Sequence, residues 1–261
     1  MSLHGSNPTL PSLLLNSHTD VVPVTLEKWT HDPFSADLVD GKIYARGSQD
    51  MKSVGIAYLE AIRRLKKDGH AFARSVHLSF VPDEEIGGAD GMEVFVGTDM
   101  FKALNVGFAL DEGIPTPFPS FLLFNSERAP WCICCTIKLI NVGIKLTARG
   151  NAGHGSVMLQ GTAVERLLAC LDKVRQFRAE QSGKLYKSDN LIRDAGKTFD
   201  VTTFTGATDA RFLRQMGIPA IGFSPFRNTP LLLHDHDEHI GIDVYLEGIS
   251  IYQSIIASLT S

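Results

Sequence analysis

The feature that most constrains the fold of this chain is an alternation of short apolar runs with segments of helical periodicity. The run Leu13-Leu14-Leu15 is followed by polar residues, and residues 76–81 and 106–110 repeat this strand pattern. Residues 50–67 carry apolar side chains at helical spacing, and Gly69 ends the segment. Strands that alternate with helices in this way predict an α/β sheet flanked by helices.

Further elements fit the same architecture. Asp40-Gly41 lies between residues 36–39 and 42–45, which predicts a β-hairpin. The last part of the chain returns to alternating patterns, which predict a helix, a strand and a closing helix over residues 209–216, 218–223 and 243–259. Polar residues follow the apolar runs repeatedly. In an α/β sheet this places them at the carboxyl ends of strands, where ligands bind.

The middle of the chain has a different pattern. Residues 131–149 are rich in β-forming side chains, and a helical pattern follows over residues 162–180. We interpret this region as an inserted α+β satellite domain at 131–198. It would separate a first catalytic part at 1–130 from a second catalytic part at 199–261.

Composition excludes several classes of protein. The 25 basic and 29 acidic side chains give a net charge of −4, without the basic excess that nucleic-acid binding requires. No apolar run approaches the roughly 20 residues of a membrane-spanning helix. The polar N-terminus has no signal-peptide pattern, so we expect a cytoplasmic protein.

The four cysteines, at positions 132, 134, 135 and 170, are a poor disulfide framework and suit a reducing compartment. Three of them crowd into four positions without the Cys-x-x-Cys spacing of a structural zinc site. A buried strand explains the cluster better than a metal site does.

Each candidate functional residue has an ordinary structural explanation when it is taken alone. His18 can be a hydrogen-bonded histidine in a turn, and Asp50 can complement a helix dipole. Glu84 and Glu85 can lie in a solvated acidic loop, and His234 can belong to a polar loop.

The same residues taken together indicate a metal centre. Each polar cluster follows an apolar run, so a sheet would bring imidazoles and carboxylates into one cleft, a ligand set that suits zinc or a similar divalent ion. Two histidines and three carboxylates can hold two ions if one carboxylate bridges them. A further carboxylate must take a proton from water, and Glu84 beside Glu85 provides both kinds of group.

Six motifs, in order, resemble the family of aminoacylases, acetylornithine deacetylases and carboxypeptidase G. They are residues 18–23 (HTDVVP), 45–52 (ARGSQDMK), 81–88 (VPDEEIGG), 109–113 (ALDEG), 206–211 (GATDAR) and 232–238 (LLHDHDE). The resemblance implies a zinc-peptidase-like fold with two Zn²⁺ ions per subunit. By the same resemblance, His18 and Glu112 would bind one ion, Glu85 and His234 the other, and Asp50 would bridge them.

The resemblance also implies roles beside the metal ligands. Asp20 would fix the imidazole of the first histidine ligand, and Glu84 would act as general base and later as acid. His154 would stabilise the oxyanion in the active site of a partner subunit, which implies a homodimer. Arg211 and Thr208 would line the substrate pocket, with the guanidinium binding the substrate carboxylate. Without the family, a structural role in a Gly-rich turn explains His154 better, and a helix-surface arginine explains Arg211 equally well.

The chain departs from the family pattern in three places. It begins almost at the first active-site strand, residues 132–150 differ from the pattern, and the satellite domain ends early, after about residue 187. The expected activity is zinc-dependent hydrolysis of N-acyl L-amino acids, small-molecule substrates, to a carboxylate and a free amino acid. Two alternatives are a dipeptidase of the same family and a truncated, catalytically impaired metal-binding form.

Overall fold

The computed structural model describes most of the chain outside its middle region. The described residues are 1–127, 168–169, 172–173, 176, 191–194 and 197–261. The chain divides into one compact unit of Met1–Arg128 with Asn190–Ser261 and a second of Ala129–Asp189. Several predictions fall outside the described residues: the β-rich segment at 131–149, His154 and all four cysteines. The predicted satellite domain therefore stays a prediction.

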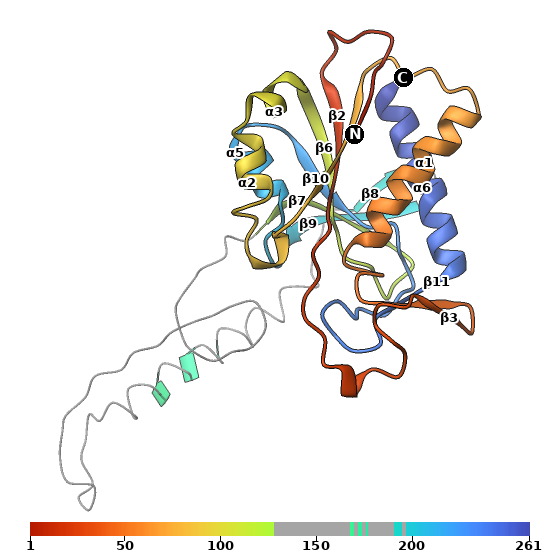
Figure 1. Ribbon diagram of the computed structural model, residues 1–261, viewed down its shortest axis with the longest axis vertical. Coiled ribbons are helices and arrows are strands. Elements are labelled where there is room, and N and C mark those ends of the chain that lie inside the picture. The colour runs from red at the N-terminus through yellow and green to blue at the C-terminus, as the bar shows by residue number, and fades with distance from the viewer. Residues whose placement is uncertain (128–167, 170–171, 174–175, 177–190, 195–196) are drawn as a thin grey trace, which may run out of the picture. The chain divides into compact units, whose positions relative to one another are not determined.

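An eight-stranded mixed sheet forms the centre of the first unit (Figure 1). Its strands, in order across the sheet, are β1 (Ser2–Leu3), β5 (Val76–Val81), β2 (Ser12–His18), β6 (Val106–Asp111), β10 (Ala220–Phe223), β7 (Phe121–Glu127), β9 (Lys197–Phe204) and β8 (Leu191–Asp194). The neighbours β5, β2, β6 and β10 run parallel, whereas β7 is antiparallel to β10. The parallel core confirms the predicted α/β class.

Helices cover both faces of this sheet (Figure 1). The two long helices α1 (Lys52–Lys67) and α6 (Ile242–Thr260) pack against each other on one face. The short helices α2 (Met92–Val96), α3 (Asp99–Ala103) and α5 (Ala210–Gln215) gather on the other. Two 3-10 turns, η1 (Leu26–Lys28) and η2 (Glu84–Ile86), lie in the connections. In the described part of the chain, no helix is long and apolar enough to cross a membrane.

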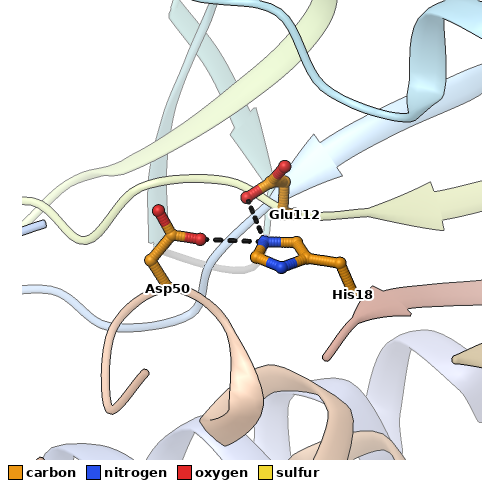
Figure 2. Close-up of side chains that lie close together, drawn as sticks. All are labelled: His18, Asp50 and Glu112. Atoms are coloured by element: carbon orange, nitrogen blue, oxygen red, sulfur yellow. Dashed lines mark hydrogen bonds and ion pairs between the residues drawn. The ribbon is translucent and has the colours of Figure 1, made fainter. Parts of the chain in front are cut away.

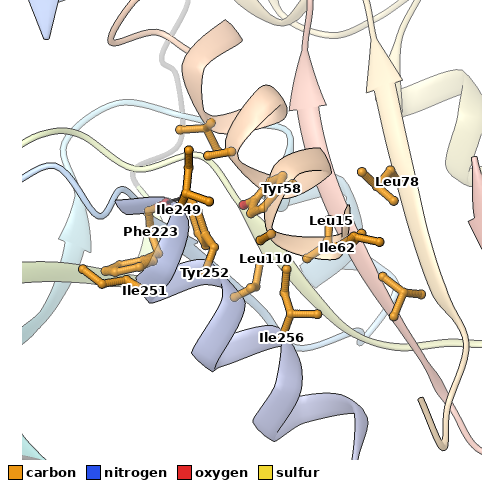
Figure 3. Close-up of a cluster of buried hydrophobic side chains, with 14 of the residues drawn as sticks. Leu15, Tyr58, Ile62, Leu78, Leu110, Phe223, Ile249, Ile251, Tyr252 and Ile256 are labelled. Atoms are coloured by element: carbon orange, nitrogen blue, oxygen red, sulfur yellow. Dashed lines mark hydrogen bonds between the residues drawn. The ribbon is translucent and has the colours of Figure 1, made fainter. Parts of the chain in front are cut away.

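The apolar run in β2 is continuous because both of its faces are buried. Leu13 and Leu15 pack into the cluster under α1 and α6, together with Tyr58 and Tyr252 (Figure 3). Leu14 points to the opposite face and packs among the residues of α2, α3 and α5. Strands that are covered on both faces lose the apolar–polar alternation of half-buried strands.

A small antiparallel sheet brings distant parts of the chain together beside the main sheet. It consists of β3 (Asp37–Val39), β4 (Lys42–Tyr44) and β11 (His239–Gly241). Asp40 and Gly41 connect β3 to β4 with positive φ angles of 47° and 72°, as a two-residue type I′ hairpin requires. Because β11 pairs with β4, the loop before β11 lies beside the residues that follow β4.

Candidate metal centre

The carboxyl ends of three parallel strands bring the acidic and imidazole side chains to one edge of the sheet. His18 is the last residue of β2 and is in register with Val81, the last residue of β5. Glu112 directly follows β6, and η2 with Glu84 and Glu85 follows β5. The sequence pattern predicted this convergence, since parallel strands end at the same edge of a sheet.

A first cluster forms around the ring of His18 (Figure 2). Its Nε2 atom lies 3.0 Å from Oδ1 of Asp50 and 3.5 Å from Oε2 of Glu112. All three residues are buried. One ligand atom from each lies within 4.8 Å of the other two, so the three side chains can share one ion.

A second cluster forms on the other side of Asp50. Nε2 of His234 lies 3.1 Å from Oδ2 of Asp50 and 3.0 Å from Oε2 of Glu85. The ligand atoms of this second group also lie within 4.8 Å of one another. The carboxylate of Asp50 therefore faces one histidine with each of its oxygens, which is the geometry of a bridging ligand.

Asp20 connects the imidazole of His18 to the loop that carries the glutamates. Nδ1 of His18 donates to the backbone carbonyl of Asp20 at 3.0 Å, and Oδ1 of that residue lies 3.4 Å away. The proton on Nδ1 leaves the Nε2 lone pair directed at Asp50 and Glu112. The Asp20 carboxylate also accepts the backbone N–H groups of Glu84 and Glu85, at 3.2 and 3.1 Å. Burial raises the pKa of Asp20, but its interaction with the His18 ring and the N–H of Glu85 outweigh burial and leave that pKa below its usual value.

The candidate ligands shift one another's pKa values. Burial raises the pKa of Asp50, but hydrogen bonds from His18 and His234 outweigh it and hold the pKa below its usual value. Hydrogen bonds to Asp50 and Glu85 raise the pKa of His234 to about 10. For His18, burial lowers the pKa, but the charge of Glu112 and hydrogen bonds to carboxylates raise it well above its usual range.

Glu84 lies at the edge of the first cluster and outside both groups of candidate ligands. Its Oε2 atom is 4.0 Å from Nε2 of His18, and its side chain is 9% exposed. Burial and the neighbouring charge of Glu112 raise the pKa of Glu84 to about 11. Burial also raises the pKa of Glu112.

This donor set fits divalent cations. Several buried carboxylates repel one another across a few ångströms, and a divalent cation would neutralise that repulsion. Imidazole and carboxylate ligands are the set that zinc prefers at catalytic sites. The part of the chain that the structure describes therefore has two adjacent positions that suit such ions, with Asp50 between them.

Arg211 and Thr208, the two residues expected to line the substrate pocket, both have polar groups engaged within the protein. The hydroxyl of Thr208 is buried; it lies 3.1 Å from Oε2 of Glu127 and accepts the N–H of Ala210 at 3.2 Å. The guanidinium of Arg211 donates to the backbone carbonyl of Gly87 at 2.6 Å, at the end of η2. Their roles toward substrate stay predictions.

The sequence reasoning assigned no role to a second layer of buried polar residues. Oδ1 of Asp111 accepts from the side chain of Asn16 at 2.9 Å, and its Oδ2 accepts the N–H of Ala210 at 2.6 Å. Asp209 is fully buried, and the Asn16 side chain interacts with its carboxylate and lowers its pKa, although burial raises that pKa more. Asp111 and Asp209 stand inside the quoted motifs, but nothing in the local sequence distinguishes a ligand from a supporting residue.

Comparison with known proteins gives this arrangement its family. The pattern of the peptidase family M20/M25/M40 matches residues 14–258, which span all the candidate ligands. The chain belongs to the M20/M25/M40 peptidase family. Membership confirms the predicted family relationship and the prediction of a metal-dependent amidohydrolase.

Aminoacylases are among the M20/M25/M40 relatives. Aminoacylase-1 of Mus musculus is 37% identical, over 98% of this chain and 82% of the mouse protein. Aminoacylase-1 of Dictyostelium discoideum is 35% identical, over all of this chain and 85% of the relative. The mouse alignment extends over 345 positions, whereas the chain has 261 residues, so the relative has residues without a counterpart here.

Solved structures of M20 proteins share the fold. The M20 metallo-carboxypeptidase Sso-CP2 of Sulfolobus solfataricus gives a TM-score of 0.61 at 16% identity, covering 98% of this chain and 86% of the other. Human carnosine dipeptidase 1 also gives 0.61, at 14% identity, covering 99% and 82%. At these identities the likeness concerns the fold, and it confirms the predicted zinc-peptidase-like sheet.

Proposed function

We propose that this protein hydrolyses N-acyl L-amino acids at a centre of two zinc ions. The observation that carries the proposal is the placement of Asp50 between His18 and His234, with one carboxylate oxygen facing each ring. The aminoacylases that align over nearly the whole chain support an N-acyl amino acid as the substrate.

The ligands divide into two sets in this proposal. His18 and Glu112 would hold one ion, Glu85 and His234 the other, and Asp50 both. Asp20 keeps the proton of His18 on Nδ1, so that Nε2 is free to bind metal. When bound, two such ions supply Lewis acidity to the acyl carbonyl and lower the pKa of water.

Glu84 would move the proton during the reaction. Water adds to the acyl carbon, and the Glu84 carboxylate takes one of its protons. The C–N bond then breaks, and the same group delivers the proton to the departing amine, which gives a carboxylate and a free amino acid. Burial and its acidic neighbours give Glu84 a high proton affinity, and adjacent cations would lower its pKa toward neutrality.

Arg211, Thr208 and His154 would contact or shape the bound substrate. Arg211 lies beside the loop of Glu84 and uses one N–H group on Gly87, so the other donors of its guanidinium are available for a substrate carboxylate. The buried Thr208 would shape the pocket through its bonds to Glu127 and Ala210. His154 would stabilise the oxyanion from a second subunit of a homodimer. We also propose a cytoplasmic location.

The test is hydrolysis of N-acetyl-L-methionine by the purified protein, with zinc content measured on the same sample. We expect about two ions per chain, as a dinuclear site requires. Replacing the proton carrier in Glu84→Gln should lower kcat by roughly 10²- to 10⁴-fold and leave the zinc content unchanged. Glu60→Gln is the matched control, because Glu60 pairs with Arg63 and Arg64 on α1 and has no contact with the centre.

The same assay separates the alternatives. Faster turnover of a simple dipeptide than of N-acetyl-L-methionine would replace the aminoacylase proposal with a dipeptidase. Two bound zinc ions without turnover of either substrate would leave a metal-binding form and refute the proposed activity. Light scattering of the purified protein would decide whether it is a dimer.

A further inference from the structure

The side chain of Gln49 holds the loop that carries His234. Gln49 is fully buried, and its Nε2 group donates to the backbone carbonyls of Pro230 at 3.0 Å and His239 at 2.8 Å. Its Oε1 atom accepts the backbone N–H of Leu232 at 3.0 Å. One amide therefore bonds to both ends of the loop, Pro230 and His239, and to Leu232 within it.

The side chain of Glu238 holds the turn that carries Asp50. Glu238 is fully buried, and its Oε1 atom accepts the backbone N–H groups of Gly47, Gln49 and Asp50 at 3.1, 2.6 and 3.3 Å. Its Oε2 atom accepts from the guanidinium of Arg46 at 3.2 Å. The carboxylate thus accepts hydrogen bonds from three backbone N–H groups of this turn, which would otherwise be buried without partners.

The two contacts are reciprocal. A residue of the Asp50 turn, Gln49, fixes the His234 loop, and a residue of that loop region, Glu238, fixes the Asp50 turn. The turn and the loop are more than 180 positions apart in the sequence, yet Nε2 of His234 lies 3.1 Å from Oδ2 of Asp50. Neither Gln49 nor Glu238 belongs to the two groups of candidate metal ligands.

We propose that Gln49 and Glu238 are positioning residues that fix the distance between the bridging carboxylate of Asp50 and the imidazole of His234. This inference rests on the proposed dinuclear centre and names the residues that hold its second half in place. His234 needs such support, because its side chain is 38% exposed and its backbone has the left-handed φ of 63°.

The two ion positions depend to different degrees on the hydrogen bonds of the Gln49 side chain. His18 terminates β2 and Glu112 follows β6, and these two strands are hydrogen-bonded to each other in the middle of the sheet. His234 lies in a loop whose hydrogen bonds converge on Gln49. Loss of the Gln49 side-chain contacts should therefore weaken the ion between Glu85 and His234 and leave the ion of His18 and Glu112 in place.

The experiment is calorimetric titration of the metal-depleted, full-length protein with Zn²⁺. In Gln49→Met, which keeps the approximate length of the side chain and removes its three hydrogen bonds, the second ion should bind about 10- to 100-fold more weakly. The affinity for the first ion should stay at the wild-type value. Ser12→Ala is the matched control, because it removes one buried side-chain bond, to the carbonyl of Leu104, at the opposite end of β2 from His18.

A residue with only a structural role would give a different result. Equal weakening of both ions, or wild-type affinity for both in a folded Gln49→Met protein, would overturn the proposal. If Gln49→Met does not fold, Gln49→Asn keeps a neutral amide that is one methylene too short to reach all of its partners, and the same asymmetry is expected. The titration needs no substrate, so failure of the proposed activity is seen separately, as wild-type protein that binds two ions and hydrolyses none.

Discussion

Asp209 offers a sharp test of the electrostatics of this molecule. Its carboxylate is fully buried, and the Asn16 side chain and the charges of His18 and Arg211 only partly offset the cost of that burial. Burial, together with repulsion from Asp111, raises its pKa to about 7. The isosteric variant Asp209→Asn removes the charge and keeps the shape of the side chain.

The size of the effect follows from the difference in pKa between the two states. The usual value is 3.8 and the folded value is about 7, so the folded state binds a proton more tightly than the unfolded state. A difference of about three pKa units corresponds to about 4 kcal/mol, at roughly 1.4 kcal/mol per unit. Because the pKa of Asp209 is raised in the folded state, the free energy of unfolding of the protein falls as pH rises from about 4 to about 7. The full cost of the buried charge is present above that range.

The measurement is the free energy of unfolding in urea for wild type and Asp209→Asn, at pH 4.5 and pH 8. A metal chelator is present, so that the metal-free proteins are compared. The variant should be more stable by about 1 kcal/mol at pH 4.5 and by up to about 4 kcal/mol at pH 8. A difference that is the same at both values would show that Asp209 does not titrate in this range. A destabilised variant at pH 8 would show that the partners of the carboxylate outweigh the cost of its burial and that the reasoning is wrong.

Three further predictions concern the ligand support, the core and the metal. Asp20→Asn keeps only one carbonyl oxygen for the N–H groups of the η2 loop, so affinity for zinc should fall about 10- to 100-fold by calorimetry; unchanged affinity would contradict the role of this carboxylate. Leu15→Ala empties a site that is 0% exposed and should cost about 2–5 kcal/mol in urea unfolding, whereas a cost below that range would mean that the site collapses. The raised pKa values of His234, about 10, and Glu84, about 11, make the metal-free protein lose stability as pH rises from 6 to 9. The rise in Tm on adding zinc should therefore grow over that range, and a constant rise would argue against proton displacement by the ion.

The fold was predictable where sequence periodicity is a direct consequence of burial. The helix over residues 50–67 and the strands β2, β5 and β6 bury regular faces, and the structure confirms them. The hairpin was predictable because the Asp40-Gly41 dipeptide favours the positive φ angles that a two-residue turn requires, and both residues adopt them. The strand β7 and the three-residue β11 were missed, because their places depend on pairing with β10 and β4 and their sequences have no alternation.

The candidate site was predictable to the level of which side chains converge. His18 ends a strand and Asp50 stands just before a helix, whereas His234 lies in a loop and was placed by the recognised motif. The supporting contacts could not be predicted in the same way. The bonds between Gln49 and the loop of His234 join residues about 180 positions apart, and nothing in either segment alone encodes the partner.

The distribution of the ligands separates metal binding from turnover in this protein. All five candidate ligands come from the unit of Met1–Arg128 with Asn190–Ser261, and strand ends and buried hydrogen bonds within that unit hold them. Metal binding therefore has its determinants in a unit with its own core. The proposed oxyanion residue, His154, comes from the other part of the chain, where the sequence departs most from the family pattern. Two bound ions would consequently test the centre itself, and only the rate of amide hydrolysis tests whether the remaining part of the chain completes it.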